Sequence, residues 1–153
     1  MNNVKINNEM NLNYPDSFRE MSAEELTKFF RSPDNRWGAI DPDRHIIFSV
    51  SWAKAGFMNS DPEMAVSEAE ARLRRSLLNY QRISEFNIKI ASKKAYGVRF
   101  EYRVDESCRV QISDMIMFKY KKNFYTIYYV TRKKNAGAYR LDFEEIIKSI
   151  SLD

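Results

Sequence analysis

Few residues of this chain have the types and the spacing that catalysis needs. His45 is the only histidine, and Asp43 and Arg44 precede it directly. A Ser-His-Asp arrangement would use His45 as the base and Ser49 or Ser51 as the nucleophile. Neither serine occurs in a Gly-x-Ser-x-Gly turn, which exposes the hydroxyl of a nucleophilic serine. We therefore expect His45 to be a surface histidine at the end of a hairpin.

The single cysteine and the isolated glycines also argue against cofactor chemistry. Cys108 follows a polar turn, and the sequence pairs no histidine with its thiol. One cysteine excludes an intrachain disulfide, and one cysteine with one histidine excludes a Cys/His zinc site. Gly137 stands alone, so no Gly-rich loop is present to cradle a phosphate. The sequence predicts neither a metal nor a cofactor.

Asp114 is the candidate pocket carboxylate, because it lies within an apolar strand pattern. By strand parity it shares a face with Val110, Ile112, Ile116 and Phe118. A structural Asp114 would be paired with an arginine, a lysine or a tyrosine hydroxyl, or would lie at the open end of the sheet. A functional Asp114 would lie in a pocket and serve a small enzyme together with nearby tyrosines. We favour the structural interpretation and expect a protein that is not an enzyme.

The segment 86–131, which positions Asp114, predicts three or four consecutive antiparallel strands. Apolar residues occupy every second position, for example from Tyr96 to Val104, as in half-buried strands. The run from Phe124 to Thr131 is apolar or aromatic on both faces, which indicates a central strand. This segment forms the core of a sheet.

Matching apolar side chains across these strands also predicts a register. Pairing Val104 with Cys108 places Phe100 opposite Ile112. A slip by one residue would bring Arg103 among the apolar partners. We therefore expect the first of these two registers.

Three helix starts are recognisable by their capping residues. Ser22 with Glu25 three residues later forms a capping box, and Asp142 with Glu145 forms another. Asp61 precedes a proline and opens the longest helix. The expected buried stripes comprise Leu26, Phe29 and Phe30 on the first helix, Val66, Ala69, Leu73, Leu77 and Tyr80 on the second, and Phe143, Ile146, Ile147 and Ile150 on the third.

The order of these elements is hairpin, helix, hairpin, helix, meander, helix. Antiparallel strands with separate helices are typical of the α+β class. We expect a single domain over residues 1–153, built as an α-β-α sandwich. Its central antiparallel sheet would have about six or more strands, flanked by three helices.

Three stretches of this chain resemble the PsbP-like superfamily, which includes the Mog-type Ran-binding import factors and a bacterial branch with secretion-effector chaperones. Residues 11–18 are similar to an early strand-proline-aromatic pattern, with Phe18 where tryptophan is common. The long helix from Asp61 precedes the meander, and residues 143–150 resemble the closing helix. The resemblance implies an α-β-α sandwich and a role in binding or assembly, and it carries over no site residue.

Charge divides unequally along the chain. Residues 1–70 hold 7 Lys/Arg and 12 Asp/Glu, a net of −5, whereas the remainder holds 18 and 9, a net of +9. The two halves either neutralise each other in the folded protein or leave a basic surface for an anionic partner.

Two groups of residues are candidates for binding a partner. The first consists of basic hairpin ends, one of them at a turn in which we expect Asn123 to be left-handed. The second is an aromatic and methionine-rich sheet face, which is either covered by a helix or open to a partner. The basic candidates are Lys119, Lys121, Lys122, Arg132, Lys133 and Lys134, and the face comprises Met115, Met117, Tyr125, Ile127 and Tyr129.

The sequence therefore predicts a non-enzymatic binding, adaptor or chaperone-like protein that uses a sheet face or a groove beside a helix. The expected partner is another protein, since no recognised nucleic-acid motif accompanies the basic ends. No run of about 18 apolar residues exists, so we expect no membrane span. As written, the chain predicts a cytoplasmic protein, although an exported protein without its leader would have the same features. The sequence does not indicate an oligomeric state.

Overall fold

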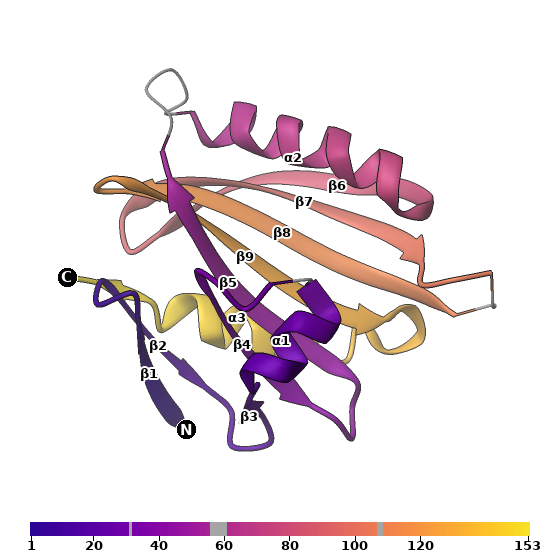
Figure 1. Ribbon diagram of the computed structural model, residues 1–153, viewed down its shortest axis with the longest axis horizontal. Helices are drawn as coiled ribbons and strands as arrows, with labels where there is room; N and C mark the ends of the chain where they lie inside the picture. Colours follow the sequence, from indigo (N-terminus) through magenta and orange to yellow (C-terminus); the bar gives the residue numbers. More distant parts are fainter. Residues whose placement is uncertain (31, 56–60, 107–108) are drawn as a thin grey trace.

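A seven-stranded antiparallel sheet forms the centre of the protein in the computed structural model, which describes residues 1–30, 32–55, 61–106 and 109–153 (Figure 1). Its strand order is β3-β4-β5-β9-β8-β7-β6, so the meander β6 to β9 occupies one side. The strands are β3 (Arg19–Glu20), β4 (Arg36–Asp41), β5 (Ile46–Lys54), β6 (Leu78–Ile90), β7 (Lys93–Arg103), β8 (Val110–Tyr120) and β9 (Asn123–Arg132).

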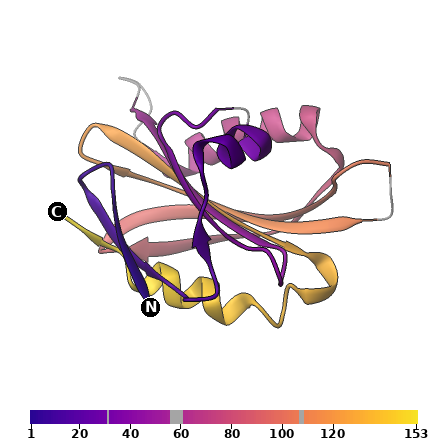
Figure 2. The ribbon, with the colours of Figure 1, turned by 60° about the horizontal axis from the view of Figure 1, so that its bottom comes forward.

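Helices cover both faces of this sheet. On one face lie α1 (Ala23–Phe30) and α2 (Pro62–Ser76), and on the other lies α3 (Arg140–Lys148) (Figure 2). A small second sheet of β1 (Asn2–Ile6), β2 (Met10–Tyr14) and β10 (Ser151–Leu152) accompanies α3, and a short 3-10 helix, η1 (Lys133–Asn135), follows β9. The expected α+β class and the α-β-α layers are confirmed.

The predicted register between β7 and β8 is wrong by one residue. Phe100 pairs with Ser113, and Arg99 pairs with Asp114. This register brings a cation directly opposite the buried carboxylate, an interaction that apolar matching alone does not consider. Because Asp114 in turn pairs with Tyr129 of β9, these two side chains share a face.

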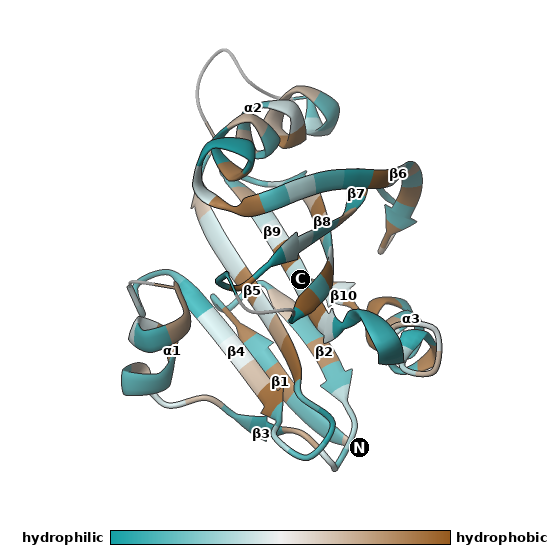
Figure 3. Ribbon diagram, turned by 90° about the vertical axis from the view of Figure 1, so that its right-hand side faces the viewer, coloured by the Kyte–Doolittle hydropathy of each residue, from teal (hydrophilic) through white to brown (hydrophobic). Residues whose placement is uncertain are grey.

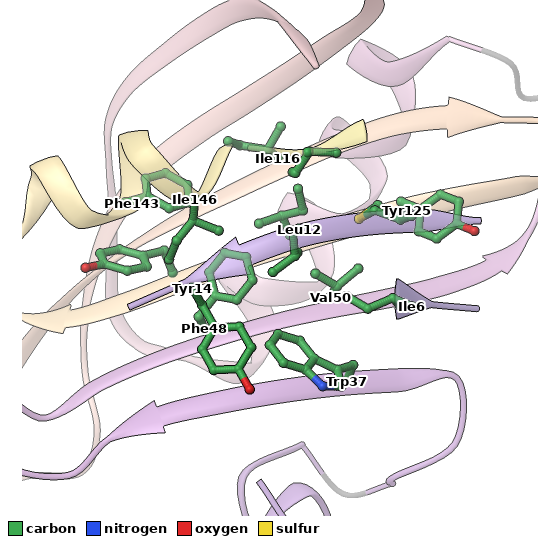
Figure 4. Close-up of a cluster of buried hydrophobic side chains, with 14 of the residues drawn as sticks. Ile6, Leu12, Tyr14, Trp37, Phe48, Val50, Ile116, Tyr125, Phe143 and Ile146 are labelled. Carbon is green, nitrogen blue, oxygen red and sulfur yellow. The ribbon is translucent and has the colours of Figure 1, made fainter. Parts of the chain in front are cut away.

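This pairing also corrects the proposed aromatic and methionine-rich face. Met115 pairs with Tyr128, so Met115 and Met117 face α2, whereas Tyr125, Ile127 and Tyr129 are on the α3 face. Each face has its own core. The core under α3 contains Leu12, Phe48, Ile116, Tyr125 and Phe143 (Figure 4), and the core under α2 contains Val66, Ala69, Val98, Phe100 and Met115.

Two of the three expected helix starts are confirmed. The amide of Glu25 donates to Ser22 Oγ at 3.2 Å, and the amide of Ser22 donates to Glu25 Oε1 at 3.1 Å. Asp61 accepts from the amide of Glu63. The third expectation is wrong, because α3 begins at Arg140, two residues before Asp142, and its N-cap Tyr139 makes no side-chain cap.

Three smaller expectations are also wrong. The helix α2 ends at Ser76, so Leu77 is its extended C-cap residue and Tyr80 belongs to β6, and neither is part of the helix stripe. Phe29 is exposed on α1. At the β8–β9 turn, Lys121 rather than Asn123 has the left-handed conformation, with φ 53°.

Candidate partner-binding groove

The strand β6 forms one edge of the main sheet. It pairs with β7 on its inner side, and within the part of the chain that the structure describes no strand pairs with its outer side. The ladder is irregular between Leu78 and Ser84 and regular from Ser84 to Ile90. The regular part therefore presents a row of backbone N–H and C=O groups that an added strand could pair with.

The apolar floor beside this edge depends on a glycine. Phe86 lies directly opposite Gly97 in the β6–β7 ladder. A Cβ atom at Gly97 would lie 2.5 Å from Cε2 and Cζ of Phe86 and 3.0 Å from Cγ1 of Ile116. Because glycine has no Cβ, the Phe86 ring lies across β7 and reaches Ile116. Ile88 extends the floor along β6, two residues further on.

The helix α3, whose ribbon Figure 3 draws together with that of β6, forms the opposite wall of a groove. The groove measures about 500 Å³, and we call it the β6–α3 groove. Its floor and walls are apolar, and Phe86 and Ile88 remain only half-buried within it. Charged side chains of both signs form its rim. The lining comprises Ser84, Glu85, Phe86, Ile88, Arg99, Ile116, Arg140, Phe143, Glu144, Ile147 and Lys148.

Asp114 lies beneath two arginines of the groove lining and is paired with both. It accepts from Arg99 Nε at 2.9 Å and from Arg140 Nη1 at 2.5 Å, and its side chain is only 4% exposed. Burial raises the pKa of Asp114, and Arg99 opposes that rise. Since Arg99 belongs to β7 and Arg140 to the first turn of α3, the carboxylate holds the helix against the sheet.

A second hollow of about 220 Å³ adjoins the groove at these arginines. Arg99, Asp114, Arg140 and Tyr129 contribute to its lining. The hydroxyl of Tyr129 donates to the Tyr139 carbonyl at 2.8 Å, and each Asp114 oxygen accepts from an arginine. Within the described residues, no group of three or more His, Cys, Asp or Glu side chains is placed to hold a metal.

The other predicted site residues lie in the cores or at strand ends. Met115 and Tyr125 are fully buried, and Tyr129 is 3% exposed. Met117 is half-buried on the α2 face. These side chains therefore pack beneath other elements of the fold.

The basic residues form two separate groups at opposite ends of the β8–β9 hairpin. Lys119, Lys121 and Lys122 are exposed at its turn. Arg132, Lys133 and Lys134 lie at the far end, where they line a shallow hollow of about 730 Å³ together with Arg109 and Val110. Lys133 is 3.2 Å from Glu101 Oε1.

His45 and Ser49 have different surroundings, which are not those of a catalytic pair. His45 is exposed on the β4–β5 turn with φ 57°, as expected for a hairpin end. Ser49 is buried on β5 and accepts from Arg36. The prediction for Cys108 falls outside the described residues.

Sequence analysis did not identify the β6–α3 groove. Phe86 and Ile88 have the alternation of a strand that packs under another element. No local sequence pattern shows that α3 leaves both side chains half-exposed. The available signal was Gly97, the single glycine of the meander, which stands two residues before Arg99 in an otherwise bulky strand.

Three solved structures resemble this chain closely in fold. The Ran-binding protein Mog1p of Saccharomyces cerevisiae matches with a TM-score of 0.68 at 10% identity, over 99% of this chain and 96% of that chain. LpqN of Mycobacterium tuberculosis, involved in cell envelope biogenesis, matches with 0.66 at 14% identity over 94% and 82%. Cyanobacterial PsbP of Synechocystis matches with 0.66 at 11% identity over 94% and 86%.

These structures define the class of fold. The chain has the PsbP- and Mog-like fold, which confirms the resemblance expected from the sequence. No protein-family model matches the sequence, and no curated protein does. Among the described residues, no helix combines the length and the apolar character that crossing a membrane requires.

Proposed function

We propose that this protein is a non-enzymatic binding protein that holds an extended segment of a protein partner in the β6–α3 groove. The observation that carries this proposal is the position of an apolar groove directly beside a regular strand edge that no other described strand pairs with. A segment added to β6 would pair its backbone with Ser84–Ile90. Its alternate side chains would enter the groove.

The contents of the groove favour an apolar segment. Phe86, Ile88 and Ile147 are half-buried, so they would lose further water-exposed surface when a partner side chain covers them. The charges at the rim are largely compensated already. Arg99 and Arg140 pair with Asp114, and Glu85 accepts from Arg82 at 2.7 Å. Recognition would therefore depend on shape and apolar contact more than on net charge.

The comparison with Mog1p supports a protein as the partner, since that protein is described as Ran-binding. The bonding of Asp114 supports a function without catalysis. Both of its oxygens accept from arginines, so they have little capacity left to take a proton from a substrate. We further propose that the basic strand ends act on the rate of encounter with an acidic partner rather than as the binding site itself.

A library of short random peptides displayed on phage tests this proposal. We expect selected peptides to carry apolar residues at every second position. Ile88→Asp places a charge on the groove floor and should weaken these peptides by roughly 10- to 100-fold, which corresponds to the loss of one buried aliphatic contact.

The matched control is Ile83→Asp, because Ile83 is an exposed isoleucine of the same strand outside the groove. Its peptide affinities should equal those of the wild type. Failure to enrich any peptide, or equal binding by both variants, would contradict the proposal.

A further inference from the structure

A further hollow lies on the opposite face of the sheet, the face that α1 and α2 cover (Figure 2). This α1–α2 cleft measures about 230 Å³ and is separate from the β6–α3 groove. Phe30 of α1 and Leu73 of α2 contribute to its walls, and Phe100, Ser113 and Tyr128 contribute from the sheet. Its volume is below the roughly 300–1,000 Å³ of pockets for drug-sized ligands, so it suits a molecule with one ring.

The cleft contains a cation without a carboxylate partner. Arg36 of β4 is half-buried, and its Cζ lies 4.2 Å from the centre of the Phe30 ring. Its Nη1 donates at 3.3 Å to the Oγ atom of Ser49, and this hydroxyl oxygen is a neutral acceptor. No ion pair among the described residues includes Arg36. The residues outside the described ranges (31, 56–60 and 107–108) include no Asp or Glu. The other edge donors of the guanidinium are suited to a planar anion.

Electrostatic effects within the cleft agree with this assignment. Burial lowers the pKa of Arg36, and the group that opposes this change is Tyr128. Burial raises the pKa of Tyr128, against the effects of Arg36 and Arg72. Tyr128 thus remains a neutral hydroxyl beside a cation, and an anion entering the cleft would meet positive potential.

Ser113 supplies a second, independent observation. Its side chain lies on the floor between Phe100 and Val130, and the residue is 2% exposed. Within the described structure its Oγ has no hydrogen-bond partner. A buried hydroxyl without a partner is uncommon in folded proteins. This hydroxyl therefore marks a place where a ligand group can both donate and accept.

The two polar groups are separated across the sheet. Arg36 reaches Ser49 on β5, whereas Ser113 is on β8, and the strand order places β9 between them. Ser49 pairs with Tyr128 and Ser113 with Val130, so two strand spacings combine with an offset of two residues along β9 to give roughly 12 Å. This separation matches one aromatic ring with a polar group at each end.

We infer that the α1–α2 cleft binds a small aromatic carboxylate that carries a second hydrogen-bonding group at its far end. The carboxylate pairs with Arg36, the ring lies between the aromatic and aliphatic walls, and the distal group bonds to Ser113. Arg36, which has no carboxylate partner among the described residues, matches one negative charge. This inference concerns a different site from the proposed partner groove and is independent of it.

Isothermal titration calorimetry with three related probes tests the inference on the wild-type protein. The probes are 4-hydroxyphenylacetate, phenylacetate, which lacks the distal hydroxyl, and 4-hydroxyphenylacetamide, which lacks the charge. We expect 4-hydroxyphenylacetate to bind about three- to tenfold more tightly than phenylacetate, and at least tenfold more tightly than the amide. Inorganic phosphate, an anion without a ring, should bind more weakly than either acid.

Two substitutions test which protein side chain binds each end of the ligand. Arg36→Met should weaken both acids at least tenfold, whereas the matched change Arg75→Met, at an exposed arginine of α2, should leave them unchanged. In Ser113→Ala the two acids should bind equally, because the partner of the distal hydroxyl is gone.

Several results would overturn the inference. They are the absence of saturable binding by 4-hydroxyphenylacetate, binding by phosphate as tight as by the acids, and a hydroxyl preference that persists in Ser113→Ala. Should Arg36→Met fail to fold, the comparison of the acid with the amide on wild-type protein still decides whether charge is recognised.

Discussion

Ser113 and Asp114 are neighbours on β8 that point to opposite faces of one sheet, and their surroundings differ completely. Asp114 faces α3, where two arginines from different elements occupy its oxygens. Ser113 faces α2, where its buried hydroxyl has no partner within the described structure. Paired polar groups hold the layers together, whereas unpaired ones have the capacity to bind something else. The comparison therefore separates a polar group that fixes α3 to the sheet from one that the fold leaves unpaired within the described residues.

The largest effect should come from breaking the paired side. Asp114→Asn removes the charge that Arg99 and Arg140 share, and both arginines are only about a third exposed or less. We expect the free energy of unfolding to fall by about 2–3 kcal/mol, the range for hydrogen bonds to charged groups with discounting for solvent at the arginines. Urea denaturation measures this change.

The control is the adjacent residue on the other face. Ser113→Ala deletes a hydroxyl without a partner, so stability should stay within about 0.5 kcal/mol or rise. An equal loss from both variants would mean that Ser113 has a structural partner, and the contrast between the faces would disappear.

A smaller effect should follow from crowding the floor of the groove. In Gly97→Ala the new Cβ would lie 2.5 Å from the Phe86 ring, so the ring must swing into the groove. Overpacking of this kind costs about 1–2 kcal/mol, and the displaced ring should also block the selected peptides. Denaturation and peptide titration measure the two consequences.

Gly137→Ala is the matched control, because a Cβ there meets no atom within 4 Å. It should change stability by less than about 0.5 kcal/mol and leave the peptides bound. Peptide affinity that survives Gly97→Ala would place their binding site away from Phe86.

The smallest effect concerns the β8–β9 turn, which belongs to neither face. Reversing Lys121 and Lys122 to Glu should change stability by less than about 0.5 kcal/mol, because both side chains are exposed. Association with an acidic groove-binding peptide should become slower, and less so at high salt. Stopped-flow rates at two ionic strengths measure this, and rates that respond to neither salt nor charge reversal would exclude steering by this turn.

Much of the fold was predictable because it depends on short-range patterns. Alternating apolar residues identified the strands of the meander, and Ser22 with Glu25 identified the start of α1. Asp142 has the same local pattern as Ser22, yet it pairs with Arg44 of the distant β4–β5 turn at 2.6 Å. A capping box and a tertiary ion pair use the same residue type, and only the arrangement in space distinguishes them.

The sites were less predictable because they depend on register and on the spacing between layers. A shift of one residue between β7 and β8 decided that Asp114 meets Arg99. Parity then separated Met115 from Tyr129. The α1–α2 cleft joins Arg36 and Ser113 from strands far apart in sequence, and no local pattern connects them.

The pairing of β10 with β2 has a consequence for the order of events during synthesis. Asn11 bonds to Asp153, which is 142 residues later in the chain, and Leu152 pairs with Met10. An isolated two-stranded hairpin is at most marginally stable in water. The β1–β2 hairpin is thus synthesised well before β10, its third strand, which follows about 140 residues later in the chain. During that interval Met10 and Leu12, which are fully buried in the native protein, remain accessible to chaperones and proteases.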